Sequence, residues 1–171
     1  RPVRSLRRSG RGLRRCRLMK PWVYFAAITS PLFALDQLTK WATLEFSPLH
    51  HEIAVIPGFF NLVHVTNTGS AFGLMKGWFN FHGIFGSIMA VVLFWLLFKK
   101  DSDKPTRWAA ALILSGIFGN ITDRVRFGHV VDFLDFYAGQ YHWPAFNIAD
   151  SAIVIAVGLF LWTSWRSDRA A

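Results

Sequence analysis

The chain has 171 residues, of which 53% are hydrophobic and only 17% charged, well below the roughly 25% charged residues of soluble domains. This composition excludes a disordered chain and disfavours an ordinary cytosolic enzyme. The formal charge of +9 arises in residues 1–20, which carry nine Lys and Arg and no acid. The rest of the chain is neutral, so it offers no basic face for nucleic acid. Cys16 is the single cysteine, which excludes a disulfide within the chain.

Four apolar segments follow one another along the chain. Segment 77–98 has 22 residues without a charge, and the other three each contain an uncharged run of 15 residues. About 20 apolar residues cross the roughly 30 Å core of a bilayer. A soluble core helix has a similar pattern, but four such segments leave too little polar sequence to cover them. We therefore predict a mostly α membrane protein with four transmembrane helices, at about 22–44, 78–98, 107–125 and 149–166.

The basic residues predict how this multi-pass protein is oriented. They cluster at both ends of the chain and in the connection 99–107, whereas the connections 45–76 and 126–148 carry two between them. By the positive-inside rule, both termini are cytoplasmic and the two long connections face outward. We expect residues 1–18 to be a poorly ordered basic extension and residues 19–171 to form one domain. A cleaved signal peptide is the competing interpretation of the N-terminal region, but no small-residue cleavage site follows its apolar stretch.

Three aspartates, one from each of three predicted helices, share a depth in the membrane. Asp36, Asp123 and Asp150 each lie 16 residues from a cation at the cytoplasmic end of their helix. At about 1.5 Å per residue this places each carboxylate ~24 Å from that end, just below the outer surface. A single aspartate near a helix end is commonly a cap. Three at one depth indicate a functional layer, because ionisable groups inside a membrane are costly.

Two of these acids belong to the same short pattern. Asn120 precedes Asp123 by three residues, and Asn147 precedes Asp150 by three. On a helix this spacing places the amide and the carboxylate on one face. An amide can donate to a carboxylate and fix its orientation, as a catalytic acid requires.

The segment between the two patterns carries further acids. Residues 128–133 combine a glycine with β-branched residues, which predicts an extended stretch. Such a stretch can return Asp132 toward Asp123 and Asp150. Spacing alone favours Asp123 as readily as Asp132, and it leaves Asp135 possible.

The first outer connection predicts a small extracytoplasmic β-sheet. Residues 59–66 follow a Pro-Gly turn and are rich in apolar and β-branched residues, as in a strand, and residues 67–70 form a second turn. A short interfacial helix over 71–77, containing Phe72, Leu74 and Met75, comes next. A sheet of this kind can hold an extended peptide by edge pairing. The alternative is a plain connecting loop.

Other chemistries have no motif in this chain. The six histidines lack zinc-binding spacing, and neither a GxSxG elbow nor a phosphate-binding loop occurs, so we expect no metal and no cofactor. A small transporter or proton conductor could use the aspartate layer as a relay, although acids spread across the bilayer would suit that function better. A membrane adaptor with a lipid-binding tail would explain residues 1–20 alone.

Five short blocks resemble the lipoprotein signal peptidases, or signal peptidase II, of bacterial cytoplasmic membranes. They occur in order and with family-like spacing over about residues 19–166. The blocks are DQLTK at 36–40; NTGSAF at 67–72; Gly116 with Gly119, Asn120, Asp123 and Arg124; Gly128 with VVDF at 130–133; and PAFN at 144–147 with ADS at 149–151.

The resemblance implies an intramembrane aspartyl endopeptidase with its active site near the outer (periplasmic) face. Such enzymes remove the signal peptide from a diacylglyceryl-modified prolipoprotein before its lipobox cysteine. The catalytic pair falls on Asp132 and Asp150, and no metal or cofactor takes part. The sheet would be the family's substrate cradle and the helix over 71–77 its lid. We expect a monomer whose partners are the prolipoprotein and membrane lipids. Supporting or substrate-binding roles fall on Asp36, Lys40, Asn67, Gly69, Asn120, Asp123, Arg124 and Asn147.

Overall fold

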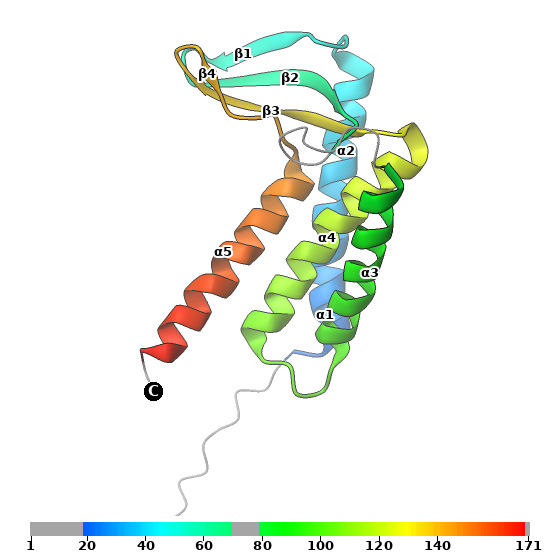
Figure 1. Ribbon diagram of the computed structural model, residues 1–171, viewed down its shortest axis with the longest axis vertical. Coiled ribbons are helices and arrows are strands. Elements are labelled where there is room, and N and C mark those ends of the chain that lie inside the picture. The colour runs from blue at the N-terminus through cyan, green and yellow to red at the C-terminus, as the bar shows by residue number, and fades with distance from the viewer. Residues whose placement is uncertain (1–18, 70–78, 170–171) are drawn as a thin grey trace, which may run out of the picture.

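The computed structural model describes residues 19–69 and 79–169 as a helical bundle capped at one end by a small sheet (Figure 1). The extension over 1–18 and the short helix expected over 71–77 lie outside the described residues. The described chain begins and ends at the end of the bundle away from the sheet (Figure 1). The helices are α1 (Pro21–Tyr24), a π-helical turn η1 (Phe25–Thr29), α2 (Ser30–Phe46), α3 (Phe79–Phe98), α4 (Lys104–Phe127) and α5 (Ile148–Asp168).

Helix α1, the turn η1 and helix α2 follow one another without a break and form the first helical rod, which contains its π-helical turn because of Pro31. Pro31 has no N–H to donate, and its ring crowds the carbonyl one turn earlier. Just before it, the backbone N–H of Ser30 donates to Phe25, five residues back, which is the π pattern. Thr29 Oγ1 then donates across the bundle to the Ala111 carbonyl at 2.9 Å. The rod is thereby tied to α4.

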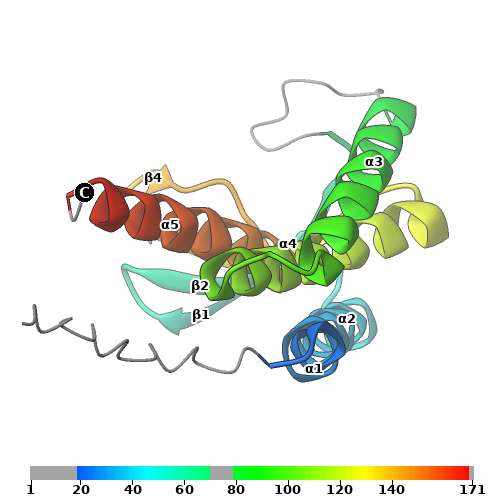
Figure 2. The same cartoon turned by 90° about the horizontal axis from the view of Figure 1, so that it is seen from below.

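Helix α4 is the centre of the bundle, with α2, α3 and α5 packed around it (Figure 2). Two glycines allow this close packing. A β-carbon at Gly116 would lie 2.6 Å from Ile153 Cγ1 on α5. One at Gly119 would lie 3.1 Å from Asp36 Cγ on α2 and 3.0 Å from Ala149 Cβ on α5. At this level α2, α4 and α5 therefore pack almost backbone to backbone.

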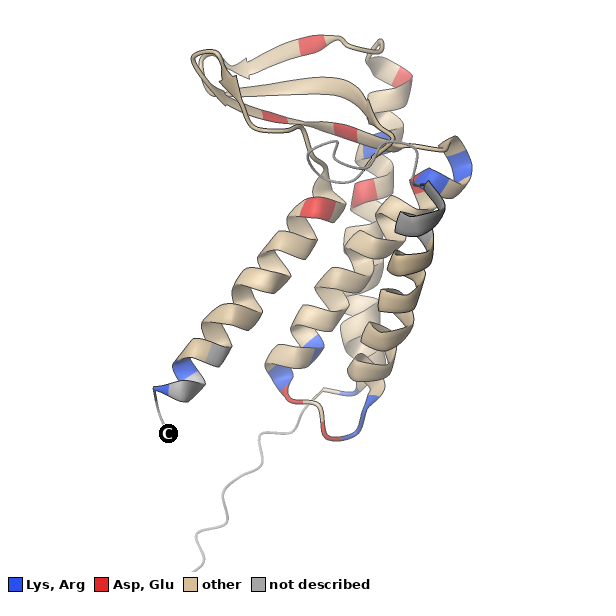
Figure 3. Ribbon diagram, in the orientation of Figure 1, with Lys and Arg blue, Asp and Glu red and all other residues tan. Residues whose placement is uncertain are grey.

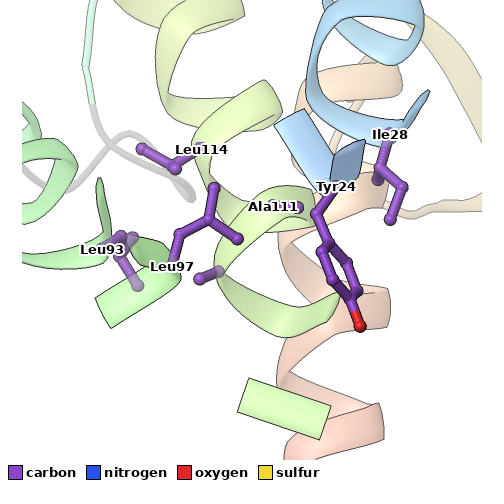
Figure 4. Close-up of a cluster of buried hydrophobic side chains, with 7 residues drawn as sticks. Tyr24, Ile28, Leu93, Leu97, Ala111 and Leu114 are labelled. Atoms are coloured by element: carbon purple, nitrogen blue, oxygen red, sulfur yellow. The ribbon is translucent and has the colours of Figure 1, made fainter. Parts of the chain in front are cut away.

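An apolar core joins the first rod, α3 and α4. Figure 4 shows Tyr24 and Ile28 on one side of Ala111 of α4, and Leu93 and Leu97 of α3 on its other side. The Tyr24 and Trp108 rings pack edge to face, with their centroids 6.2 Å apart. The buried members of this core are Tyr24, Ile28, Leu93, Leu97, Ala110, Ala111 and Leu114.

Many large apolar side chains remain exposed on the outer surfaces of the helices. Val91 on α3 and Val154 on α5 are each 70% exposed. Among the residues that the structure describes, no helix combines the length and apolar character required to cross a membrane. The four transmembrane helices predicted from the sequence are therefore not confirmed, whereas the helical class with a small sheet is confirmed.

The sheet is antiparallel, with the strand order β1-β2-β3-β4. The predicted strand is β2 and the extended return segment is β3, so the plain-loop alternative is wrong. Strand β1 was not predicted, and β3 continues well beyond residue 133. A bulge places Leu62 opposite Leu134 but Val65 opposite Asp132, and it lies next to the candidate site. The strands are β1 (Glu52–Ile56), β2 (Phe60–Asn67), β3 (Val130–Ala138) and β4 (Tyr141–His142).

Candidate active site

Asp132 and Asp150 come from different elements and are joined by one side chain. Asp132 lies on β3, and Asp150 lies in the first turn of α5. The Asn147 amide Nδ2 donates to Asp132 Oδ1 at 2.7 Å, and its Oδ1 accepts the backbone N–H of Asp150 at 3.0 Å. Asn147 immediately precedes α5, where an asparagine oxygen commonly caps a free N–H of the first turn. The helix cap therefore also fixes the position of the carboxylate on the sheet.

Each of the two aspartates has a second amide partner. Asn67 Nδ2 on β2 donates to Asp132 Oδ2 at 3.0 Å, and Asn120 Nδ2 on α4 donates to Asp150 Oδ1 at 2.8 Å. Asp132 is only 1% exposed. Burial raises the pKa of Asp132 to about 7, the negative charge of Asp150 adds to this rise, and the hydrogen bonds from Asn67 and Asn147 oppose it. Asp132 can therefore hold a proton near neutral pH.

A buried lysine lies beneath this pair. Lys40 on α2 is 2% exposed, and its Nζ lies 2.9 Å from carboxylate oxygens of both Asp36 and Asp123. A buried charge is tolerated only when it is paired in this way. Lys40 Nζ also donates to Asn120 Oδ1 at 3.1 Å. This contact turns the NH₂ group of Asn120 toward Asp150.

The two carboxylates bound to Lys40 also hold the backbone beside the candidate pair. Asp36 Oδ1 accepts the N–H of Ala149 at 2.9 Å, and Asp123 Oδ2 accepts the N–H of Val131 at 3.2 Å. Each acceptor thus anchors the residue immediately before Asp150 or Asp132. The Lys40 network sets the backbone positions of both aspartates as well as the orientation of one of them.

The turn after β2 is held from α4. The N–H of Gly69 donates to Asn67 Oδ1 at 3.1 Å. Arg124 Nη2 donates to the Gly69 carbonyl at 3.2 Å, and its Nη1 donates to the Asn120 carbonyl at 3.3 Å. Arg124 therefore connects the end of β2 to the helix that carries Asn120.

A pocket of about 750 Å³ opens beside Asp150. Its polar lining includes Asn67, Asn120, Arg124, Asp150 and Ser151, and apolar residues of α5 and of segment 143–146 form much of its wall. A carboxylate at the edge of a largely apolar pocket suits a peptide with an apolar portion. Within the described residues, no group of three or more His, Cys, Asp or Glu side chains is arranged to hold a metal ion.

A family model described as "Signal peptidase (SPase) II" matches residues 28–166. The chain belongs to the signal peptidase II family. It is 46% identical over 143 residues to the lipoprotein signal peptidase of Syntrophotalea carbinolica, covering 81% of this chain and 89% of that protein. It is 43% identical over 150 residues to that of Syntrophus aciditrophicus, covering 84% and 92% of the two chains. A bacterial membrane enzyme solved by the in meso method at 2.3 Å resolution matches with a TM-score of 0.78 and 31% identity, over 84% of this chain and 88% of its own.

The signal peptidase II chain brings the site residues predicted from its sequence into one hydrogen-bonded network. The local pairing expected within each Asn-x-x-Asp pattern is wrong, however. Asn120 donates to Asp150 on another helix rather than to Asp123, and Asn147 donates to Asp132 on the sheet. The amides orient acids of other elements because helices α4 and α5 and strand β3 converge here.

Three contributors to this site were not among the predicted residues. Gln37 Nε2 donates to Asp123 Oδ1 at 3.0 Å and to Asp36 Oδ2 at 3.2 Å. Gly116 and Gly119 provide the close helix contacts described above. All three lie inside the sequence blocks that resemble signal peptidase II, so the resemblance could have indicated them. Their contacts, however, are seen only in the folded bundle.

Proposed function

We propose that this signal peptidase II removes the signal peptide from diacylglyceryl-modified prolipoproteins before the lipobox cysteine, and that it is an aspartyl endopeptidase. The observation that carries the proposal is the arrangement of Asp132 and Asp150, joined through Asn147 next to a largely apolar pocket. The prolipoprotein substrate is inferred from the names of the relatives.

The proposed chemistry uses two carboxylates that share one proton, since the negative charge of Asp150 opposes ionisation of Asp132. Asp132, whose pKa is raised to about 7, is the protonated member and donates its hydrogen bond to the scissile carbonyl. Asp150 is the ionised member and takes a proton from the attacking water. That proton passes to the leaving amine as the tetrahedral intermediate breaks down. Asn120, oriented by Lys40, keeps Asp150 in position throughout.

We further propose that the bundle lies in the bacterial inner membrane, with the sheet and site near the outer face and both termini cytoplasmic. The exposed apolar side chains of α3 and α5 support this placement, because such surfaces are costly in water. In Figure 3, most acidic residues lie along the sheet and at the sheet end of the helices, and most basic residues lie at the opposite end, although each end carries some residues of the other sign. The asymmetry agrees with the positive-inside rule. The substrate's acyl chains can then stay in lipid while its peptide bond reaches the pocket.

The test is cleavage of a diacylglyceryl-modified prolipoprotein by the purified protein. We expect wild type to release the signal peptide, and Asp132→Asn and Asp150→Asn to lose activity while remaining folded. An intact substrate after incubation with folded wild-type protein would overturn the proposed function. If Asp123→Asn alone abolished cleavage, the peptidase function would stand but the catalytic pair would be wrong.

A further inference from the structure

A second polar cluster lies on the sheet, away from the proposed catalytic pair. Asp135, three residues after Asp132 on β3, is 5% exposed, and Asn61 on β2 is fully buried. Asn61 Nδ2 donates to Asp135 Oδ2 at 3.0 Å and to Glu52 on β1 at 2.6 Å. The ring nitrogen Nδ1 of His142 lies 2.9 Å and 3.0 Å from the two oxygens of Asp135. Asp135 thus joins three strands through side chains alone.

His142 belongs to the shortest strand of the sheet. Strand β4 has two residues and pairs with the end of β3, where His142 lies opposite Tyr137. The two rings stack at 4.9 Å with an angle of 6° between their planes. A two-residue edge strand has little stability of its own. The contact with Asp135 and the ring stack therefore provide much of what holds β4 on the sheet.

The chain that follows His142 leads directly to the pocket. Residues 143–146 all line it. Backbone hydrogen bonds of Trp143 to Phe136 at 2.8 Å and of Phe146 to Leu134 at 3.1 Å tie this segment to β3. Asn147, with its contacts to Asp132 and Asp150, comes next. One end of the pocket wall is thus anchored by the proposed catalytic pair, and the other end by the contact between His142 and Asp135.

We propose that Asp135 is a positioning residue that, through His142, fixes segment 143–146 as a wall of the substrate pocket and so determines affinity for the apolar part of the substrate. This inference rests on the proposed function. Among the described residues, Asp135 is not one of those that line the pocket, so we expect its loss to leave the chemical step intact. A charge-assisted hydrogen bond is among the stronger contacts available to an edge strand. Without it, the wall samples other positions and substrate binding weakens.

The test is steady-state cleavage of the diacylglyceryl-prolipoprotein by wild type, Asp135→Ala and His142→Ala. We expect KM to rise about tenfold in both variants, with kcat within about threefold of wild type, as when binding is lost without loss of transition-state contacts. Asp135→Asn, which keeps an acceptor for the His142 N–H, should recover most of the affinity. Tyr141→Ala is the matched control, because Tyr141 is 86% exposed on the same strand, and its KM should stay at the wild-type value.

Three results would separate the possible failures. Unchanged KM in folded Asp135→Ala and His142→Ala, with wild type active, would overturn this inference alone. A fall in kcat without a rise in KM would also overturn it. Wild type that leaves the substrate intact would overturn the proposed function and this inference together. If Asp135→Ala does not fold, the KM of His142→Ala alone tests the inference. The His142 side chain is partly exposed, so its replacement leaves the buried residues in place.

Discussion

Gly119→Ala tests whether close packing of three helices holds the site together. Alanine is favoured over glycine within a helix by about 1 kcal/mol, so helix propensity alone predicts stabilisation. The added β-carbon would, however, lie 3.0 Å from Ala149 Cβ and would crowd the Asp36 carboxylate. Overpacking costs about 1–3 kcal/mol, and displacing the charged acceptor of the Ala149 N–H costs about 1.5–3 kcal/mol more. After the gain in helix propensity is subtracted, we expect a net loss of about 1.5–5 kcal/mol in the free energy of unfolding.

The matched control is Gly158→Ala on α5, where an added β-carbon meets nothing within 4 Å. That variant should be unchanged or slightly more stable. Unfolding of the purified proteins in detergent, followed by circular dichroism, measures both changes. Prolipoprotein cleavage should fall in Gly119→Ala alone, because Asp36 anchors the residue before Asp150. Equal stability and activity of the two variants would refute the reasoning.

Three further changes probe the charges and amides of the site. The folded chain keeps a proton on Asp132 up to pH about 7, whereas the unfolded chain releases it near pH 4. The free energy of unfolding should therefore decrease as the pH rises from about 4 to about 7. Asp132→Asn should make this decrease smaller in a series of unfolding curves measured at different pH values. Lys40→Met leaves two buried carboxylates without their cation, and it should lower the free energy of unfolding by about 3–5 kcal/mol in chemical unfolding. Lys99→Met, at an exposed lysine, is the control and should lower it by less than about 1 kcal/mol. Equal losses in the two variants would contradict the role of the buried ion pairs. Asn120→Ala removes a hydrogen bond to Asp150, so in steady-state cleavage it should lower kcat about 10- to 100-fold with little change in KM. An unchanged kcat would contradict the orienting role of Asn120.

The helical class and the main strands of the sheet were predictable, because their signals are local. Long apolar runs predict helices wherever they occur, and the β-branched residues of β2 and the start of β3 predict extended chain. Strand β1 was not predicted, although three of its five residues, Ile53, Val55 and Ile56, are β-branched and were an available signal for an extended segment. The π-helical turn next to Pro31 was not predictable, because a proline in an apolar run can equally begin or end a helix.

The grouping of the site residues was predictable only in part. Depth along the helices drew attention to Asp36, Asp123 and Asp150, since rise per residue is a fixed property of helices, and all three lie in one network with Lys40 and Asn120. It gave no reason to prefer Asp132, whose position depends on a strand returning to the helix ends, and the family resemblance supplied that choice. The cross-element hydrogen bonds of Asn120 and Asn147 were not predictable, because residue spacing reports neighbours on one helix and says nothing of the facing one.

The double role of Asn147 links the folding of this protein to its proposed catalysis. The same amide completes the first turn of α5 and positions the carboxylate on β3. A substitution chosen to improve the cap, such as Asn147→Ser, would retain an oxygen acceptor for the helix but replace the amide N–H that Asp132 accepts with a shorter hydroxyl. Selection for a more stable enzyme therefore cannot act on this position independently of selection for activity. We expect stabilising changes to accumulate elsewhere, at sites such as Gly158, where an added β-carbon meets nothing within 4 Å.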